Sequence, residues 1–290
     1  MERTDKNTVK RAILSRPSDA HKGTFGTLLS ICGSYSMAGA VTLSSRSALK
    51  CGLGLLKTAL PQSIYPIVAQ AVCESVFLPL KETDEGRISK SNIEYLLKEA
   101  EKANAVLIGC GLSVCDDTKE LVKAFVLNCT TPMVLDADAL NCISENPELL
   151  KSAKAEIIIT PHPAEMARLI NSSAKLVNED RANTALSFAK KFNTVTVLKG
   201  AGTIIASPDG RVLINNTGNS GMATGGSGDV LAGIIASLLA QNKNAFDCAS
   251  AGVYLHGLSG DIAKEKFGEI SMLPSDMVDC IYLAFKQCGF

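Results

Sequence analysis

The sequence predicts an α/β protein with a mostly parallel central sheet and helices on both faces. Short apolar or β-branched segments alternate with longer helix-like segments along most of the 290 residues. Short strands that alternate with helices need crossover connections, which make neighbouring strands parallel and cover both faces of the sheet. With 46% hydrophobic and 20% charged residues, the chain also has enough apolar material for a substantial core.

In the N-terminal half, each expected strand is a short apolar run that ends at a residue typical of turns or strand ends. Gly33, Pro61, Gly109 and Asp136 follow these runs directly. The expected strands are 27–32, 55–60, 105–108 and 132–135, and the expected helices are 38–51, 65–73, 91–103 and 118–127.

The C-terminal half continues the alternation and ends in helices. Pro161 stops a strand at 156–160, and helix 179–191 precedes a β-branched strand at 194–198. The turn 207–210, with the sequence SPDG, is expected to join strands 203–206 and 212–215 in a hairpin. The expected helices that follow are 229–241, 245–266 and 275–286. No repeat or linker interrupts the pattern, so residues 1–290 are predicted to form one domain.

Charge and cysteine usage narrow the class of protein. The 29 basic and 29 acidic side chains balance, which argues against a general nucleic-acid-binding protein. The ten cysteines form no CxxC pair and many lie in apolar segments, which favours free thiols. The N-terminus is charged and does not resemble a secretion leader, and the apolar run 230–240 is too short to span a bilayer. We therefore expect a cytoplasmic protein that binds neither membrane nor nucleic acid.

The strongest candidate site is the glycine-rich segment before the apolar helix 229–241. Four glycines lie within residues 221–228, so the backbone can approach a ligand closely. A helix N-terminus also offers unpaired N–H groups and a positive dipole end, which suit a phosphate. Asp229 could accept a proton from a substrate hydroxyl as phosphoryl transfer begins, or it could simply cap the helix. No Walker A or complete GxGxxG motif is present.

Other strand ends carry weaker candidates, since ligands of open α/β sheets bind beyond the carboxyl ends of strands. His162 lies between two prolines that could direct its imidazole into the cleft, although a lone histidine is as often structural. It has no metal-ligand spacing with the other histidines, which argues against zinc. The loop 199–203 permits close backbone approach or is merely a tight turn. Asp136 and Asp138 could hold magnesium-bound water, or one of them could cap the next segment.

Taken together, these segments resemble the ADP/ATP-dependent NAD(P)H-hydrate dehydratases, a branch of the ribokinase-like fold. The matching motifs run in order from residue 22 to 241 and continue weakly through 254–257. GGSGD alone indicates only the wider kinase-like group, whereas TPHPAE together with KGTFG is much more specific. The motifs are KGTFG (22–26), GSYSMAGA (33–40), VLDADALN (134–141), TPHPAE (160–165), VLKGAGT (197–203) and GNSGMATGGSGDVLAGIIASLLAQ (218–241). Ser220, often Pro, and Ser227, often Thr, depart from the commoner pattern.

The resemblance implies a repair enzyme whose substrate is the S-form of NADH or NADPH hydrated at carbon 6 of the nicotinamide ring. A nucleotide phosphorylates the hydroxyl, and phosphate then leaves to restore the double bond. Hydroxide is a poor leaving group, so its conversion to phosphate makes the elimination feasible. ADP is the implied donor, giving AMP and phosphate with Mg²⁺, and ATP is the alternative donor.

The resemblance also implies site residues. Ala40, Gly111, His162 and Asp229 would contact the hydrate, with Asp229 as the base. The adenine nucleotide would contact Gly228 and the loop formed by Lys199, Gly200, Ala201, Gly202 and Thr203. No residue is assigned as a direct metal ligand.

A homotetramer is implied as well. Some family members carry a fused epimerase that interconverts the hydrate epimers. Only some twenty residues precede KGTFG here, so we expect no fused epimerase and a separate one as a possible partner.

Two alternative functions stay open. One is a ribokinase-like kinase that phosphorylates a small alcohol, such as a vitamin precursor, and keeps the phosphorylated product. The other is a nucleotide-binding regulatory module without turnover. Asp229 argues against the regulatory module, because nucleotide binding alone needs no base.

Overall fold

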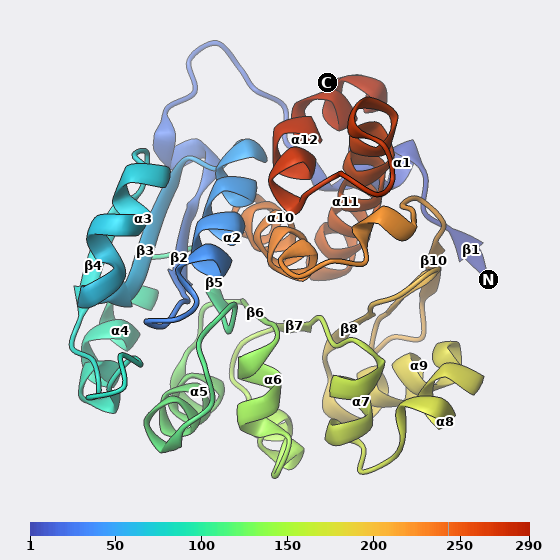
Figure 1. The fold of residues 1–290 in the computed structure, drawn as a ribbon. Coiled ribbons are helices and arrows are strands. Elements are labelled where there is room, and N and C mark those ends of the chain that lie inside the picture. Colours follow the sequence, from blue (N-terminus) through green and yellow to red (C-terminus); the bar gives the residue numbers. More distant parts are fainter. Residues whose placement is uncertain (243) are drawn as a thin grey trace.

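The structure is a computed structural model that describes residues 1–242 and 244–290. Within these residues the strands form one ten-stranded sheet in the order β1-β10-β9-β8-β7-β6-β5-β2-β3-β4 (Figure 1). The strands are β1 Glu2–Arg3, β2 Thr27–Ile31, β3 Leu55–Pro61, β4 Val76–Leu80, β5 Ala105–Ile108, β6 Met133–Leu135, β7 Ile157–Ile159, β8 Val195–Leu198, β9 Thr203–Ala206 and β10 Val212–Asn215.

Strand β9 is antiparallel to both of its neighbours, β8 and β10, and the other paired strands are parallel. The mostly parallel sheet is therefore confirmed, and so is the hairpin, whose strands have the predicted bounds. Its turn closes with Gly210 at φ +101°, a conformation that glycine adopts without steric cost.

Helices cover both faces of the sheet, as predicted. They are α1 Lys6–Ala12, α2 Ala38–Lys50, α3 Tyr65–Ala71, α4 Ile93–Ala100, α5 Asp116–Asn128, α6 Asp138–Ile143, α7 Pro163–Leu169, α8 Ala174–Glu179, α9 Arg181–Phe192, α10 Ser227–Gln241, α11 Ala245–Phe267 and α12 Pro274–Cys288. One apolar cluster joins the sheet to α1, α2, α3, α10, α11 and α12, and a second joins its other face to α4 through α9 (Figure 1).

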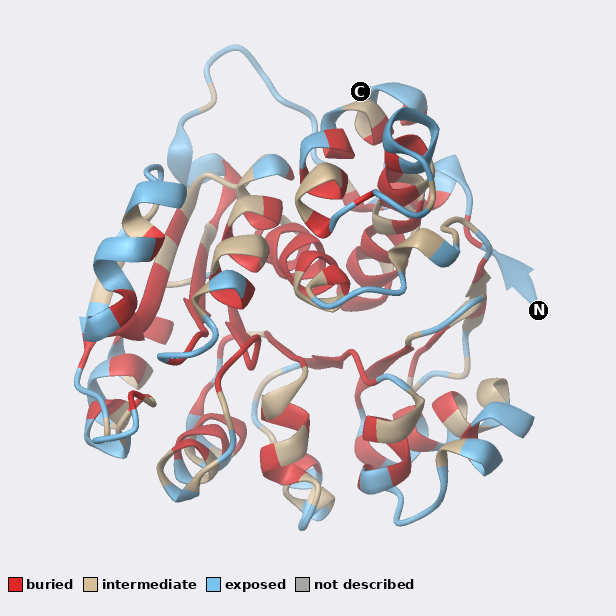
Figure 2. Cartoon of the chain, in the orientation of Figure 1, coloured by how far each residue is buried: buried red, intermediate tan, exposed pale blue. Residues whose placement is uncertain are grey.

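Helix α10 lies at the centre of the first cluster and is buried around most of its circumference (Figure 2). A helix that is apolar on every side is stable only inside a protein, which agrees with its VLAGIIASLLA sequence. Its backbone comes very close to α2 at Gly233, where a Cβ atom would lie 2.1 Å from Ser47 Oγ and 2.2 Å from the Ser44 carbonyl oxygen. The position of α10 against α2 therefore depends on a glycine.

Several short elements were not predicted. These are β1, α1, β4, α6, α7 and α8, none longer than seven residues. Strand β4 contains Pro79, which is compatible with its place at the edge of the sheet, where one side needs no donor. Pro163 stands at the first position of α7, where its missing N–H removes no helical hydrogen bond.

The ten cysteines are free thiols, as expected, and most of them are buried. Cys73 is the exposed one and Cys115 is half-buried. Among the described helices, none has the length and apolar character needed to cross a membrane.

Candidate active site

The carboxyl ends of four neighbouring parallel strands meet at one edge of the sheet. Cys110 follows β5, Asp136 follows β6, Thr160 follows β7 and Lys199 follows β8. Helix α10 begins above these residues: oxygen atoms of Asp229 and Asp136 and the Cys110 sulfur all lie within 4.8 Å of one another. The strand-end placement expected for a ligand site of an open α/β sheet is therefore present.

Helix α10 begins without a side-chain cap. Gly226, at φ +99°, is the N-cap residue and Asp229 is the third residue of the helix, so the interpretation of Asp229 as the cap is wrong. The amides of Gly226, Gly228 and Asp229 donate to no acceptor in the described chain. Unpaired amides at the N-terminus of a long helix can hold an anion.

A half-buried histidine, His256, contacts this first turn. His256 Nε2 lies 2.9 Å from the Ser227 carbonyl oxygen, to which it donates. Burial lowers the pKa of His256 to about 4, so the ring is neutral at physiological pH. Ser227 Oγ lies 3.4 Å from the same nitrogen, so the serine side chain also contacts His256.

Asp229 lies half-buried at the start of this helix. The pKa of Asp229 is raised to about 7: burial is the largest cause and the charge of Asp136 adds to it, while Cys110 and Lys199 act in the opposite direction. A carboxylate that titrates near neutrality beside an anion site is well suited to accept a proton from a hydroxyl.

Lys199 leaves its loop and points under α10. Its Nζ lies 2.9 Å from Asp136 Oδ1 and 3.7 Å from Glu165 Oε2, and a Cβ atom on Gly228 would lie 3.5 Å from it. Burial by itself lowers the pKa of Lys199, but Asp136 and Glu165 outweigh it and raise the pKa above its ordinary value. Lys199 is therefore a permanent cation between two carboxylates and the α10 N-terminus.

The Cys110, Asp136 and Asp229 cluster does not have the character of a metal site, although its donor atoms are close. Asp136 Oδ1 already accepts from Lys199 Nζ and, at 2.6 Å, from Thr160 Oγ1. Contact with Cys32 and burial raise the pKa of Cys110 well above its ordinary value, so it remains a neutral thiol and a poor ligand. Asp138 accepts from the Ser113 amide at 2.8 Å, which is a structural role.

His162 caps helix α7. Its Nδ1 accepts from the amides of Ala164 and Glu165 at 3.1 and 3.2 Å, so the structural alternative for this residue is correct as far as its Nδ1 goes. Its Nε2 lies 3.4 Å from Glu165 Oε1, and the side chain is 47% exposed. Glu165 therefore joins His162 to Lys199, and the imidazole edge stays accessible to a ligand.

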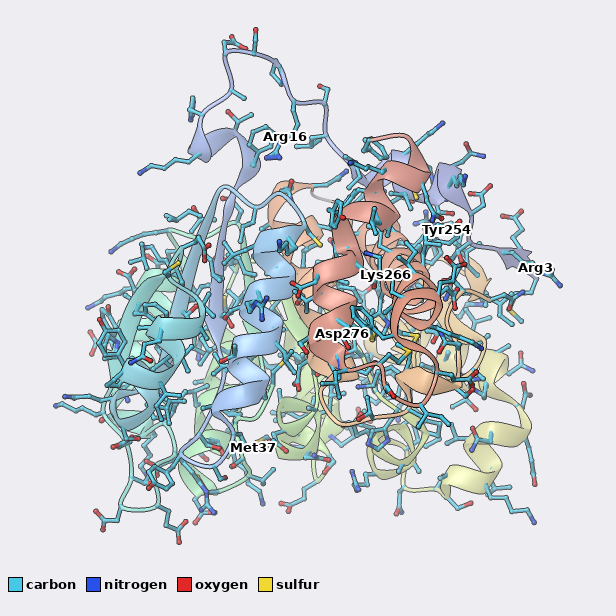
Figure 3. The ribbon with its side chains drawn as sticks, turned by 45° about the horizontal axis from the view of Figure 1, so that its top comes forward. Arg3, Arg16, Met37, Tyr254, Lys266 and Asp276 are labelled. Carbon is cyan, nitrogen blue, oxygen red and sulfur yellow. The ribbon has the colours of Figure 1, made fainter. Side chains whose placement is uncertain are left out.

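Two of the expected hydrate contacts, Ala40 and Gly111, touch each other. A Cβ atom on Gly111, at φ +64°, would lie 2.7 Å from Ala40 Cβ and 2.8 Å from Met37 Cβ. Met37 marks the loop that leads into α2 (Figure 3). Gly111 directly follows Cys110, so this contact adjoins the cluster around Asp229.

Gly228→Val is expected to weaken nucleotide binding sharply while the protein still folds. The φ angle of Gly228 is not positive, contrary to the sequence-based concern, so valine meets no backbone strain there. Its methyl groups would fill the space between Lys199 Nζ and the free amides. Calorimetric titration with ADP tests this, and unchanged affinity in a folded variant would contradict it. Gly226→Ala is the contrasting control: Gly226 has φ +99°, which a residue with a Cβ rarely adopts, so alanine should destabilise the fold.

Sequence reasoning missed two residues of this region and one pairing between residues that it did name. It named Asp136 and Lys199 separately but did not pair them, it gave Glu165 no role, and it did not consider Arg181, which binds the carbonyls of the 199–203 loop. The pairing needs the strand order, since β6, β7 and β8 are neighbours in the sheet.

Comparisons with known proteins identify the family of the chain. A profile of the NAD(P)H-hydrate dehydratase family matches residues 28–283. The chain is 41% identical over 264 residues to a bifunctional NAD(P)H-hydrate repair enzyme of Moorella thermoacetica, covering 91% of this chain and 50% of that protein. It is 38% identical over 257 residues to an ADP-dependent (S)-NAD(P)H-hydrate dehydratase of Neisseria meningitidis, covering 88% and 82%.

A solved structure of the same family has the same fold. An ADP/ATP-dependent NAD(P)H-hydrate dehydratase from Bacillus subtilis, co-crystallized with ATP/Mg²⁺, superposes with a TM-score of 0.84 at 28% identity, covering 99% of this chain and 98% of that one. The expected ribokinase-like fold is confirmed. The chain spans about half the length of the bifunctional relatives it matches. Because the family profile covers most of the sequence, the chain belongs to the NAD(P)H-hydrate dehydratase family.

Proposed function

We propose that the chain catalyses the nucleotide-dependent dehydration of the S-form of C6-hydrated NADH and NADPH. The observation that carries this proposal is Asp229, a carboxylate with a pKa near neutrality at the uncapped N-terminus of α10. A base and an anion site in contact are what the transfer of phosphate to a hydroxyl requires.

The reaction proceeds in two steps. Asp229 accepts the proton of the C6 hydroxyl while that oxygen attacks the β-phosphorus of ADP, and AMP leaves with the electrons of the broken P–O bond. The amides of Gly226 and Gly228 and the Lys199 ammonium stabilise the charge on the transferred group. The C6–O bond then breaks, phosphate leaves with its electrons, and carbon 5 loses a proton as the ring double bond re-forms. The sum is hydrate plus ADP to NAD(P)H, AMP and phosphate.

The remaining residues divide between the two substrates. Ala40, Gly111 and His162 contact the hydrate, and the Ala40–Gly111 contact and the accessible His162 edge support this assignment. Gly228 and the loop of Lys199, Gly200, Ala201, Gly202 and Thr203 contact the nucleotide. Only the backbone of Lys199 belongs to the loop, since its side chain lies with Asp136.

Magnesium accompanies the nucleotide in this proposal. The buried carboxylates of Asp136 and Glu165 face Lys199, so a side-chain cation already neutralises these two groups. Mg²⁺ commonly binds through substrate phosphates and water, and it would neutralise phosphate charge there. From the family we also infer a cytoplasmic homotetramer in which residues 1–290 act as one domain, with a separate epimerase as a possible partner.

Product analysis tests the function and its donor. With S-form hydrate and ADP we expect nicotinamide absorbance to appear together with AMP and phosphate. A stable phosphorylated product without NADH would favour the kinase alternative. ATP consumed to ADP with much higher efficiency than ADP to AMP would overturn the donor assignment but not the dehydration. The absence of turnover with either nucleotide would overturn both.

A further inference from the structure

Arg181 occupies the inner side of the 199–203 loop. It is the first residue of α9, and its Nη2 donates to the carbonyl oxygens of Leu198 and Lys199, both at 2.9 Å. Its Nη1 donates to the Ala201 carbonyl oxygen at 2.5 Å. One guanidinium group thus holds three carbonyls of one turn, which its planar fork of donors makes possible.

These contacts fix the direction of the loop amides. In a trans peptide the C=O and the following N–H point in opposite directions. Because the carbonyls of Lys199 and Ala201 face Arg181, the amides of Gly200 and Gly202 face away from it. The Gly200 carbonyl accepts from Thr203 Oγ1 at 3.0 Å instead, so it is not one of the carbonyls that Arg181 holds. The amides of residues 200–202 donate to no acceptor in the described chain.

Glycine is required where the guanidinium lies. Gly200 has φ +136° and Gly202 has φ +66°, conformations that other residues rarely adopt. A Cβ atom on Gly200 would also lie 2.9 Å from Arg181 Nη2. The two glycines and Arg181 therefore favour the same backbone conformation of the 199–203 loop.

Within residues 1–242 and 244–290, the charge of Arg181 has no carboxylate partner. No acidic side chain of the described residues lies within salt-bridge distance of it, and its Nε is buried without a hydrogen-bond partner. The preceding Asp180 is bound to the amide and side chain of Asn183 instead. An arginine that binds only carbonyls leaves a positive charge behind the amides of Gly200 and Gly202, which face away from it, and such a combination attracts an anion.

We propose that Arg181 is a positioning residue of the nucleotide site, which holds the 199–203 loop so that its amides face the phosphate that remains on AMP. It acts through the loop and through its charge, at a distance from Asp229 and the transferred group. The inference rests on the proposed function only in that the anion is a nucleotide phosphate.

Binding of AMP and of adenosine separates this role from a merely structural one. NMR titration of wild type, Arg181→Gln and Arg181→Lys with both ligands needs no turnover. We expect Arg181→Gln to lower AMP affinity about tenfold or more, the size of a lost charge-assisted contact, with adenosine affinity within about twofold. Arg181→Lys keeps the charge but cannot hold three carbonyls, so its loss for AMP should be intermediate. Lys191→Gln, which removes an exposed cation from the same helix, should change neither the AMP affinity nor the adenosine affinity.

Kinetics give a second readout. Arg181→Gln should raise KM for ADP while kcat at saturating ADP and KM for the hydrate stay within about twofold, the pattern of uniform binding loss. Equal losses for AMP and adenosine, or unchanged AMP affinity in a folded variant, would overturn the inference. If Arg181→Gln does not fold, Arg181→Lys decides the matter by the same comparison. Wild type that binds AMP without dehydrating the hydrate would overturn the proposed function and leave this inference standing.

Discussion

Asp229→Asn is expected to lower turnover by about 100- to 10,000-fold, the usual contribution of a general base. Nucleotide affinity should stay within several-fold, because the amides of Gly226 and Gly228 and the Lys199 ammonium are unaffected. Steady-state kinetics with calorimetric titration of ADP measures both. A folded variant with a near-wild-type rate would remove Asp229 from the mechanism. Asp279→Asn, a surface carboxylate paired with Arg46, is the matched control and should change neither quantity.

The raised pKa of Asp229 determines how kcat/KM and stability are expected to change with pH. A base with a pKa of about 7 must be deprotonated to act, so kcat/KM should rise with pH through about 7. A raised folded pKa means that the folded state binds the proton more tightly than the unfolded state. The resulting stability is present below the ordinary value of 3.8 and is lost as pH rises to about 7. Thermal unfolding should therefore show Asp229→Asn gaining on wild type between pH 4 and pH 8.

Lys199→Met is expected to destabilise the fold and to shift the pH profile. It would leave Asp136 and Glu165 without their cation, and breaking a buried ion pair by removing one partner costs about 3–5 kcal/mol. Because Lys199 lowers the pKa of Asp229, its removal should move the acid limb of kcat/KM to higher pH, with part of the lost rate recovered there. Denaturant unfolding and pH-rate profiles measure the two effects.

Lys57→Met is the matched control for this experiment. Lys57 is 18% exposed, close to the 17% of Lys199, and its Nζ lies 2.7 Å from Glu99 Oε2. Its loss should lower stability without moving the acid limb. An unchanged acid limb in Lys199→Met would show that the ammonium does not act on Asp229.

Elements whose signals are local could be predicted from the sequence. The hairpin bounds matched because SPDG specifies a turn by itself. Helix α10 was found because its apolar run is long, although it begins at Ser227, two residues before the predicted start. Strand β4 was missed because its Pro79 speaks against a strand unless the edge position is known.

The site was predictable only in part, because its contacts depend on the order of the strands in the sheet. Each strand-end motif could be named, but Asp136 and Lys199 lie 63 residues apart and meet only through the sheet order. Arg181 has no local signal, since an arginine at a helix start is usually an ordinary surface residue.

The crossing of α2 and α10 at Gly233 links the protein interior to the separation between Ala40, the proposed hydrate contact, and Asp229, the proposed base. Ala40 precedes Ser44 on α2 by four residues, and Asp229 precedes Gly233 on α10 by four, about one helical turn in each case. The expected hydrate contact and the base are therefore offset equally from the point where the two backbones touch. A larger side chain at this crossing would widen the separation between base and hydrate without altering any group that binds a ligand. Sequence change far from the cleft can thus alter turnover through helix spacing alone.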